Sequence, residues 1–158
     1  ALFAGLLLLG HMAGSFDLIG FSYYSAQTVF ADATTGPYPA DARTGPMGYA
    51  PWSEGLGIVL RRLAVELPGR PLLVCEHGVG TPTSKGLGGD DWRCQVLDAS
   101  LREVDAAIDD GIDVRGFFHW TGVDNYEWLH GFDVQFGLFD RDRQAKPSAA
   151  LAARWARR

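Results

Sequence analysis

Short apolar runs alternate with longer segments of helical period along the chain. The apolar runs cover residues 16–24, 71–75 and 114–119. Segments of helical period follow the first two runs, over residues 53–67 and 91–110. An apolar run followed by a helical segment is typical of a βα unit, so this order predicts an α/β fold with a parallel sheet.

Residues that start or stop helices mark the ends of these segments. Ser53 is a predicted N-cap, and Pro68 ends the first helix. Gly111 is a predicted C-cap of the second helix. Pro147 stands at the first position of a last predicted helix over residues 148–157.

Apolar side chains recur at helical spacing in both long helices, which predicts one buried face on each. These side chains are Leu56, Leu60, Leu63, Leu67, Leu97, Leu101, Val104 and Ile108. A Pro-rich stretch over residues 25–52 and a Gly-rich stretch over residues 77–89 predict long loops. A further short apolar run over residues 136–139 precedes the last helix.

The chain has 158 residues, of which 47% are hydrophobic and 21% charged, and no linker divides it. This composition predicts a single globular domain over residues 1–158. The apolar stretch within residues 1–14 is too short to span a membrane and is interpreted as the remnant of a preceding element. Three βα units are too few for a closed barrel, which typically takes eight units and about 250 residues.

Charge and cysteine content exclude several classes of protein. A net charge of −5 disfavours a nucleic-acid partner. Two cysteines, Cys75 and Cys94, provide no disulfide framework, which favours a reducing, cytoplasmic location. The four histidines lack compact ligand spacing, so no metal and no cofactor are predicted.

Polar and aromatic side chains stand where the predicted strands end. Tyr24 follows the first strand, Glu76 follows the second, and Trp120 follows the third, with Asp124 and Glu127 close behind it. The carboxyl ends of parallel strands share one edge, so these groups are expected to converge. A carboxylate after an apolar strand is either ion-paired or functional, and the position of Glu76 alone favours neither reading.

Aromatic residues are concentrated near the last strand, where eight of the nineteen fall between Phe117 and Phe139. Aromatic faces stack on the apolar faces of sugars, while carboxylates bind sugar hydroxyls, so this composition suits a carbohydrate pocket. An aromatic core is the alternative. That alternative is weak around Glu127, between Tyr126 and Trp128, because it would bury a charge.

Several motifs then stand in register with one family. FDLIGFSYY (16–24), VCEHG (74–78) and FHWTGVDNYEW (118–128) resemble the sixth, seventh and eighth strands of family 1 glycoside hydrolases, as do the stretches 109–118, 135–140 and 146–155. These are retaining glycosidases of the β-glucosidase type, built on a (β/α)8 barrel. The resemblance runs from about Phe16 to the end of the chain and implies the C-terminal three βα units of a TIM barrel, left incomplete.

The resemblance also implies roles for individual residues. Glu76 is similar to the catalytic nucleophile, which forms a covalent glycosyl-enzyme, and Tyr24 to the tyrosine that orients it. Substrate-binding positions implied by the resemblance, which include the floor and the closing aromatic of the glycone subsite, are Trp120, Glu127, Trp128 and Phe136.

Three further positions are of interest for substrate binding. Ser22 stands where the family usually has Asn, which affects a hydrogen bond near the reacting end of the sugar. His77 replaces the Asn after the nucleophile and is expected to titrate near neutrality. His119, just before Trp120, is a candidate substrate contact, and packing inside the protein is equally open.

The family's general acid lies in an N-E-P motif on the fourth strand, and no such motif occurs here. The resemblance therefore implies a retaining β-glycosidase that hydrolyses O-glycosidic bonds of β-glucosides or related sugars. Its acid would lie in an N-terminal part of the same barrel, which is the expected partner, and the 158-residue chain alone is expected to be nearly inactive. The alternative is a non-catalytic, vestigial half-barrel that binds carbohydrate.

Overall fold

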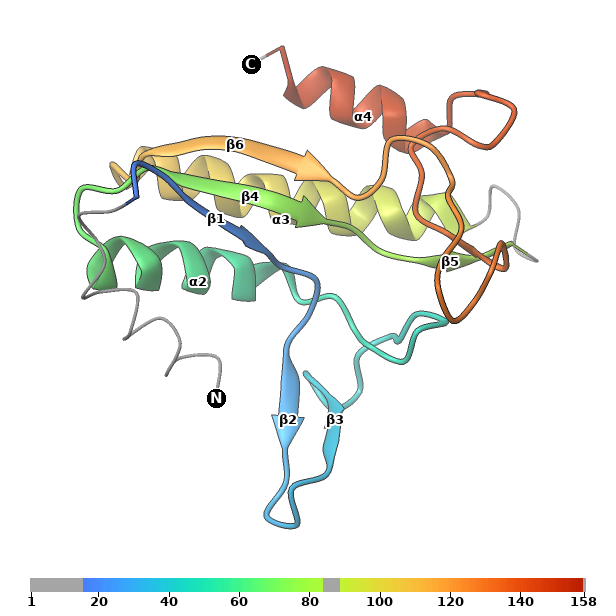
Figure 1. Cartoon of the computed structure of the whole chain (residues 1–158), viewed down its shortest axis with the longest axis horizontal. Coiled ribbons are helices and arrows are strands. Elements are labelled where there is room, and N and C mark those ends of the chain that lie inside the picture. The colour runs from blue at the N-terminus through green and yellow to red at the C-terminus, as the bar shows by residue number, and fades with distance from the viewer. Residues whose placement is uncertain (1–15, 84–88, 158) are drawn as a thin grey trace.

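The computed structural model describes residues 16–83 and 89–157. The interpretation of residues 1–14 therefore concerns residues outside the described part. Three parallel strands form the main sheet in the order β1 (Ile19–Ser22), β4 (Leu72–His77) and β6 (Val114–His119). Figure 1 shows two helices lying along this sheet, α2 (Ser53–Glu66) and α3 (Asp90–Asp109). This arrangement confirms the predicted α/β class.

The core lies between the sheet and α2, and the predicted apolar face of α2 supplies most of it. Leu56, Leu60, Leu63 and Leu67 are all buried, as predicted. They pack with Leu72 and other apolar residues of the strands. Burying an apolar side chain of this size contributes about 1.5–3 kcal/mol, so the leucine spacing determines which face of α2 packs against the sheet.

The last helix, α4 (Pro147–Trp155), packs against α3 and begins with Pro147, as predicted. The C-cap of α3 is Asp110 rather than the predicted Gly111, which follows it with a φ of +85°, a conformation that glycine adopts without strain. The prediction for Ser53 is wrong, because Trp52 is the N-cap of α2. Ser53 Oγ instead donates to the carbonyl of Val96 at 3.4 Å and ties α2 to α3.

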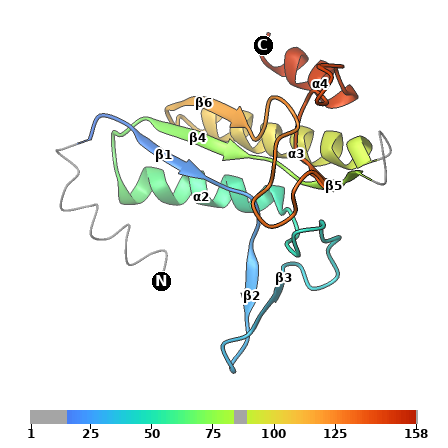
Figure 2. The same cartoon turned by 45° about the vertical axis from the view of Figure 1, so that its right-hand side comes forward.

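The Pro-rich segment between β1 and α2 is more ordered than the loop predicted for it. It contains an antiparallel hairpin of β2 (Gln27–Val29) and β3 (Thr35–Pro37), which projects away from the main sheet (Figures 1 and 2). Asp32 accepts hydrogen bonds from the backbone N–H and hydroxyl of Thr34 in the turn. A local turn of this kind leaves little periodic signal in a sequence.

Two short strands form a separate antiparallel pair. β5 (Thr81–Pro82) lies in the predicted loop 77–89, of which residues 84–88 are outside the described ranges, and it pairs with β7 (Val134–Gln135). The apolar run 136–139 is therefore not a strand. Its backbone follows the loop after β6 instead, since Leu138 N–H donates to Thr121 O at 3.0 Å.

The main sheet has open edges at β1 and β6 and does not close into a barrel within the described residues. Phe118, on β6, is 57% exposed. A groove of about 510 Å³ runs between α3, β6 and α4. The predicted buried face of α3 lines this groove, which leaves Ile108 48% exposed. The prediction is wrong for Ile108, because no described residue covers the groove there, whereas Leu97 and Val104 are buried, as predicted.

Candidate active site

Glu76 and Tyr24 meet at the carboxyl ends of β4 and β1. The register shifts between Phe21 and Ser22, so that Ser22 pairs with Glu76. Tyr23 N–H then donates to the Glu76 carbonyl at 2.9 Å. The next side chain, Tyr24, donates from its hydroxyl to Glu76 Oε2 at 3.0 Å. Glu76 forms no salt bridge with Lys or Arg in the described part of the chain.

The electrostatics of this contact favour a neutral phenol on Tyr24. Burial raises the pKa of Tyr24, and its hydrogen bond to Glu76 raises it further. The phenol therefore keeps its proton and acts as the donor. The contact therefore places a phenolic donor 3.0 Å from one oxygen of the candidate nucleophile.

Trp120 and Glu127 lie together in the loop after β6. Trp120 N–H donates to the His77 carbonyl at 2.8 Å, which places Trp120 at the end of β4 as well as β6. Its indole Nε1 donates to Glu127 Oε1 at 3.3 Å, and Glu127 is only 8% exposed. A tight turn holds Glu127, whose N–H donates to the Gly131 carbonyl at 2.8 Å.

Phe136 lies beside the first of these two pairs, against Tyr24. It is buried, and its ring packs edge-on against Tyr24 with a centroid distance of 6.3 Å. The His119 ring binds the Phe136 carbonyl through Nε2 at 3.0 Å. Burial lowers the pKa of His119 to about 4, so this imidazole is neutral at pH 7.

Two of the predicted residues, Ser22 and Trp128, are exposed to solvent. Ser22 is exposed, opposite Glu76 in the register of β1 and β4. Trp128 is 91% exposed, and among the described residues it makes no ring contact or side-chain hydrogen bond with the rest of the site.

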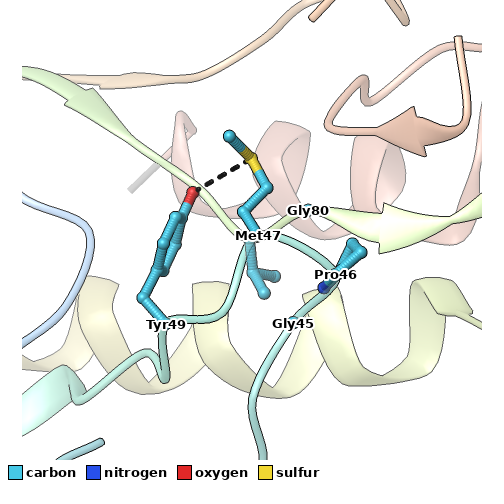
Figure 3. Close-up of a pocket in the computed structure, with 6 residues that line it drawn as sticks. Gly45, Pro46, Met47, Tyr49 and Gly80 are labelled. Atoms are coloured by element: carbon cyan, nitrogen blue, oxygen red, sulfur yellow. Dashed lines mark hydrogen bonds between the residues drawn. The ribbon is translucent and has the colours of Figure 1, made fainter. Parts of the chain in front are cut away.

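Tyr49 also belongs to this environment, although the sequence did not single it out. Its ring lies 6.1 Å from that of Tyr24, in an edge-on arrangement. Burial raises the pKa of Tyr49 to about 12, with a further contribution from the charge of Glu127. Figure 3 shows it beside Met47, whose Sδ accepts a hydrogen bond from Tyr49 Oη at 3.7 Å. An aromatic residue in a Pro- and Gly-rich segment was the only available signal.

His77 points away from Glu76 into the core, which corrects the expectation that it titrates near neutrality. It is 2% exposed and stacks on Tyr23, with ring centroids 6.4 Å apart. Burial lowers its pKa to about 3, and His119 contributes in the same direction. A neutral, packed imidazole therefore follows the candidate nucleophile.

Asp124 was expected to converge with the candidate sugar-binding residues, and that prediction is wrong. Its carboxylate is buried against Lys146 Nζ, 2.7 Å from each oxygen. Neither side chain exceeds 4% exposure. Burying an unpaired carboxylate costs free energy, so the ion pair with Lys146 explains why the Asp124 side chain points inward.

Within residues 16–83 and 89–157, no three His, Cys, Asp or Glu side chains are grouped so that they could hold a metal ion. No helix in the same ranges is long and apolar enough to cross a membrane. Both cysteines are free thiols.

Comparison with known proteins identifies the family. Residues 9–156 match glycosyl hydrolase family 1. The chain belongs to glycosyl hydrolase family 1. This confirms the resemblance predicted from the strand-end motifs.

Family 1 relatives come from distant organisms. A bifunctional β-D-glucosidase/β-D-fucosidase from Bifidobacterium breve is 33% identical over 146 residues, covering 77% of this chain and 32% of the relative. A β-galactosidase from Sulfolobus acidocaldarius is 32% identical over 145 residues, covering 82% and 28%.

Solved family 1 structures agree with the fold. A β-glucosidase from Thermotoga maritima in complex with glucoimidazole superposes with a TM-score of 0.78 at 25% identity, over 90% of this chain and 34% of that one. The apo structure of β-glucosidase 1317 gives a TM-score of 0.74 at 37% identity, over 89% and 34%. The chain thus spans about a third of the length of the relatives it matches.

Proposed function

We propose that the chain is the C-terminal three βα units of a (β/α)8 barrel in a retaining β-glycosidase, with Glu76 as its nucleophile. The observation that carries this proposal is the hydrogen bond from Tyr24 to Glu76 at the carboxyl ends of two parallel strands. Active sites of (β/α)8 barrels lie at that end of the sheet. Membership in a glycosyl hydrolase family supports the reaction class.

In this mechanism, a Glu76 oxygen attacks the anomeric carbon as the bond to the leaving-group oxygen breaks. The leaving oxygen takes a proton from a general acid, and a covalent glycosyl-enzyme remains. Water then attacks the same carbon, giving its proton back to the acid residue and releasing Glu76. Tyr24 would hold the attacking carboxylate in position through its hydrogen bond.

The general acid would come from a part of the protein outside this sequence. Retaining enzymes place two carboxyls about 5–5.5 Å apart. The other glutamates of the chain are poor candidates for this second carboxyl. Glu54 and Glu66 lie on α2 and Glu103 lies on α3, while Glu127 accepts a hydrogen bond from Trp120. The open edges of the sheet at β1 and β6 would adjoin the remaining strands, so the partner is the N-terminal part of the same barrel.

The substrate would be a β-glucoside or a related glycoside. Relatives are named for activity on β-glucosides, β-fucosides and β-galactosides. Trp120 would form the floor of the glycone subsite, with Phe136 closing it, and Glu127 would bind the outer hydroxyls. The close contact of Trp120 with Glu127 supports a shared subsite.

Covalent trapping tests this proposal most directly. The full-length protein is incubated with a 2-deoxy-2-fluoro-β-glucoside that carries an activated leaving group. The labelled protein is then digested, and its peptides are analysed by mass spectrometry. We expect the sugar mass on the peptide that contains Glu76, and no label in Glu76→Gln. A label on another carboxylate, or wild-type turnover by Glu76→Gln, would remove Glu76 from this role.

The 158-residue chain alone provides a second test. We expect it to hydrolyse at most an activated aryl glucoside, very slowly, because such a leaving group needs little acid assistance. Normal turnover of cellobiose by this chain would contradict the proposed position of the acid. Sugar binding by the full-length protein without any covalent label would favour the alternative, a carbohydrate-binding module.

A further inference from the structure

Two buried ion pairs involve the loop that carries Trp120 and Glu127, or the segments packed against it. Asp124 pairs with Lys146, and each side chain is 4% exposed. Asp90 pairs with Arg93, and each is 1% exposed. None of these four groups belongs to the proposed catalytic or sugar-binding set.

Asp124 connects the two segments that hold the proposed glycone subsite. It lies between Trp120 and Glu127 in sequence, and its Oδ1 accepts a hydrogen bond of 2.7 Å from Gly137 N–H, next to Phe136. Its own N–H donates to the Phe139 carbonyl at 2.9 Å. One carboxylate thus holds the loop after β6 against the segment that follows β7.

The second pair extends the same network to the helices. Arg93, on α3, donates to the Gln135 carbonyl at 2.7 Å, one residue before Phe136. Asp90 accepts hydrogen bonds from the N–H and hydroxyl of Ser148, at 2.7 and 2.8 Å. Ser148 lies two residues after Lys146, so both pairs converge on the start of α4.

The stability of the fold does not by itself account for such a cluster. Burying two opposite charges costs so much desolvation that an apolar pair of similar volume is often equally stable or more stable. A charged pair does fix the relative position of the two segments that carry it, because each partner is costly to leave alone.

We propose that Asp124 and Lys146 are positioning residues that set the glycone subsite, by fixing where Glu127 and Trp120 lie relative to Phe136. This inference rests on the proposed function, because it assumes that these three residues bind the sugar. Asp124 acts through the backbone of its loop and touches no substrate. Loss of the ion pair should therefore change the relative affinity of the protein for different sugars.

The test compares glucose with xylose, which lacks the hydroxymethyl group. Glu127 is the proposed partner of the outer hydroxyls, so a displaced loop should weaken glucose binding more than xylose binding. The dissociation constants of both sugars are measured by tryptophan fluorescence in the full-length protein, together with Tm. A merely structural role would change Tm, or both constants equally.

The key variant is the double substitution Asp124→Asn with Lys146→Met, which removes both charges and leaves neither partner buried alone. We expect its Tm to stay within a few degrees of wild type, and the preference for glucose over xylose to fall about tenfold. Lys146→Arg keeps the charge pair and should retain most of the preference, whether or not the double variant folds. Arg102→Gln removes an exposed pair on α3 and is the matched control.

An unchanged preference in a folded double variant would overturn the inference. So would a wild type that does not prefer glucose, or Lys146→Arg that loses the preference while keeping its Tm. Failure of the proposed function shows separately, as absence of turnover or of a covalent label on Glu76. The binding ratio needs neither turnover nor a label.

Discussion

Tyr24 donates a hydrogen bond of 3.0 Å to Glu76 Oε2, whereas its neighbour Tyr23 donates to the carbonyl of Trp52 at 2.7 Å. Successive side chains point to opposite sides of an extended segment. The two tyrosines therefore serve two environments, the candidate active site and the core against α2.

We expect Tyr24→Phe to lower kcat/KM of the full-length protein about 10–100-fold, because a hydrogen bond to a charged group is lost. Tm should change little, since the ring and its contact with Phe136 remain. Tyr23→Phe is the matched control. It leaves the Trp52 carbonyl without this donor, so it should lower Tm and spare kcat/KM. The reverse pattern would contradict this division.

Gly78 is expected to be intolerant of any side chain. A Cβ at this position would lie 2.2 Å from the Trp120 carbonyl oxygen, which belongs to the backbone and must shift. Gly78→Ala should therefore lower Tm by several degrees and weaken sugar binding. Gly122→Ala, where a Cβ meets nothing within 4 Å, should behave like wild type. Thermal melts and fluorescence titrations compare the two, and equal effects would refute the steric argument.

His77 should make the fold sensitive to acid. Its pKa falls from 6.5 to about 3 on burial, so between these pH values the unfolded chain binds a proton that the folded chain does not. The free energy of unfolding therefore decreases as pH falls below 6.5, by up to about 1.4 kcal/mol per pH unit from this group. Its contribution above pH 6.5 is constant. His119, with a pKa of about 4, acts in the same direction.

Urea unfolding from pH 7 to pH 4.5 measures this slope. We expect His77→Asn to flatten it relative to wild type, even though the loss of stacking on Tyr23 lowers stability at every pH. A His77→Asn slope identical to wild type would mean that this imidazole does not limit acid stability.

Glu127→Gln should separate sugar binding from the chemistry at Glu76. The amide can still accept from Trp120 Nε1 but binds sugar hydroxyls less strongly than a carboxylate. We expect glucose affinity to fall about tenfold, with no change in labelling of Glu76 by the fluorosugar at saturation. A loss of labelling at saturation would show that Glu127 acts on the reaction itself.

Two kinds of feature could be predicted from the sequence: the buried face of a helix and the residues that meet at the ends of parallel strands. The leucines of α2 were assigned to the core, and Tyr24 and Glu76 were expected to converge, because both follow from spacing and parallel topology. The direction of an individual side chain was less accessible. Asp124 and Glu127 are three residues apart in one loop, yet only the fold shows that Asp124 turns inward to Lys146.

Long-range partners account for the other differences. Tyr49 and His77 carry no local pattern that reveals what they pack against. Tyr49 reaches Tyr24 across 25 residues of sequence, and the burial of His77 depends on Tyr23 and Phe117 from two other segments. The hairpin of β2 and β3 depends on turn contacts that hydrophobic periodicity does not record.

The depth of the Asp124–Lys146 pair has a consequence for salt tolerance. Dissolved ions screen exposed charges over about 8 Å at physiological ionic strength, and they screen buried pairs much less. The pair between Arg102 and Asp98, with side chains 68% and 32% exposed, weakens in brine, whereas Asp124 and Lys146 keep their attraction. Concentrated salt would thus loosen the outer surface of α3 before it disturbed the loop of Trp120 and Glu127.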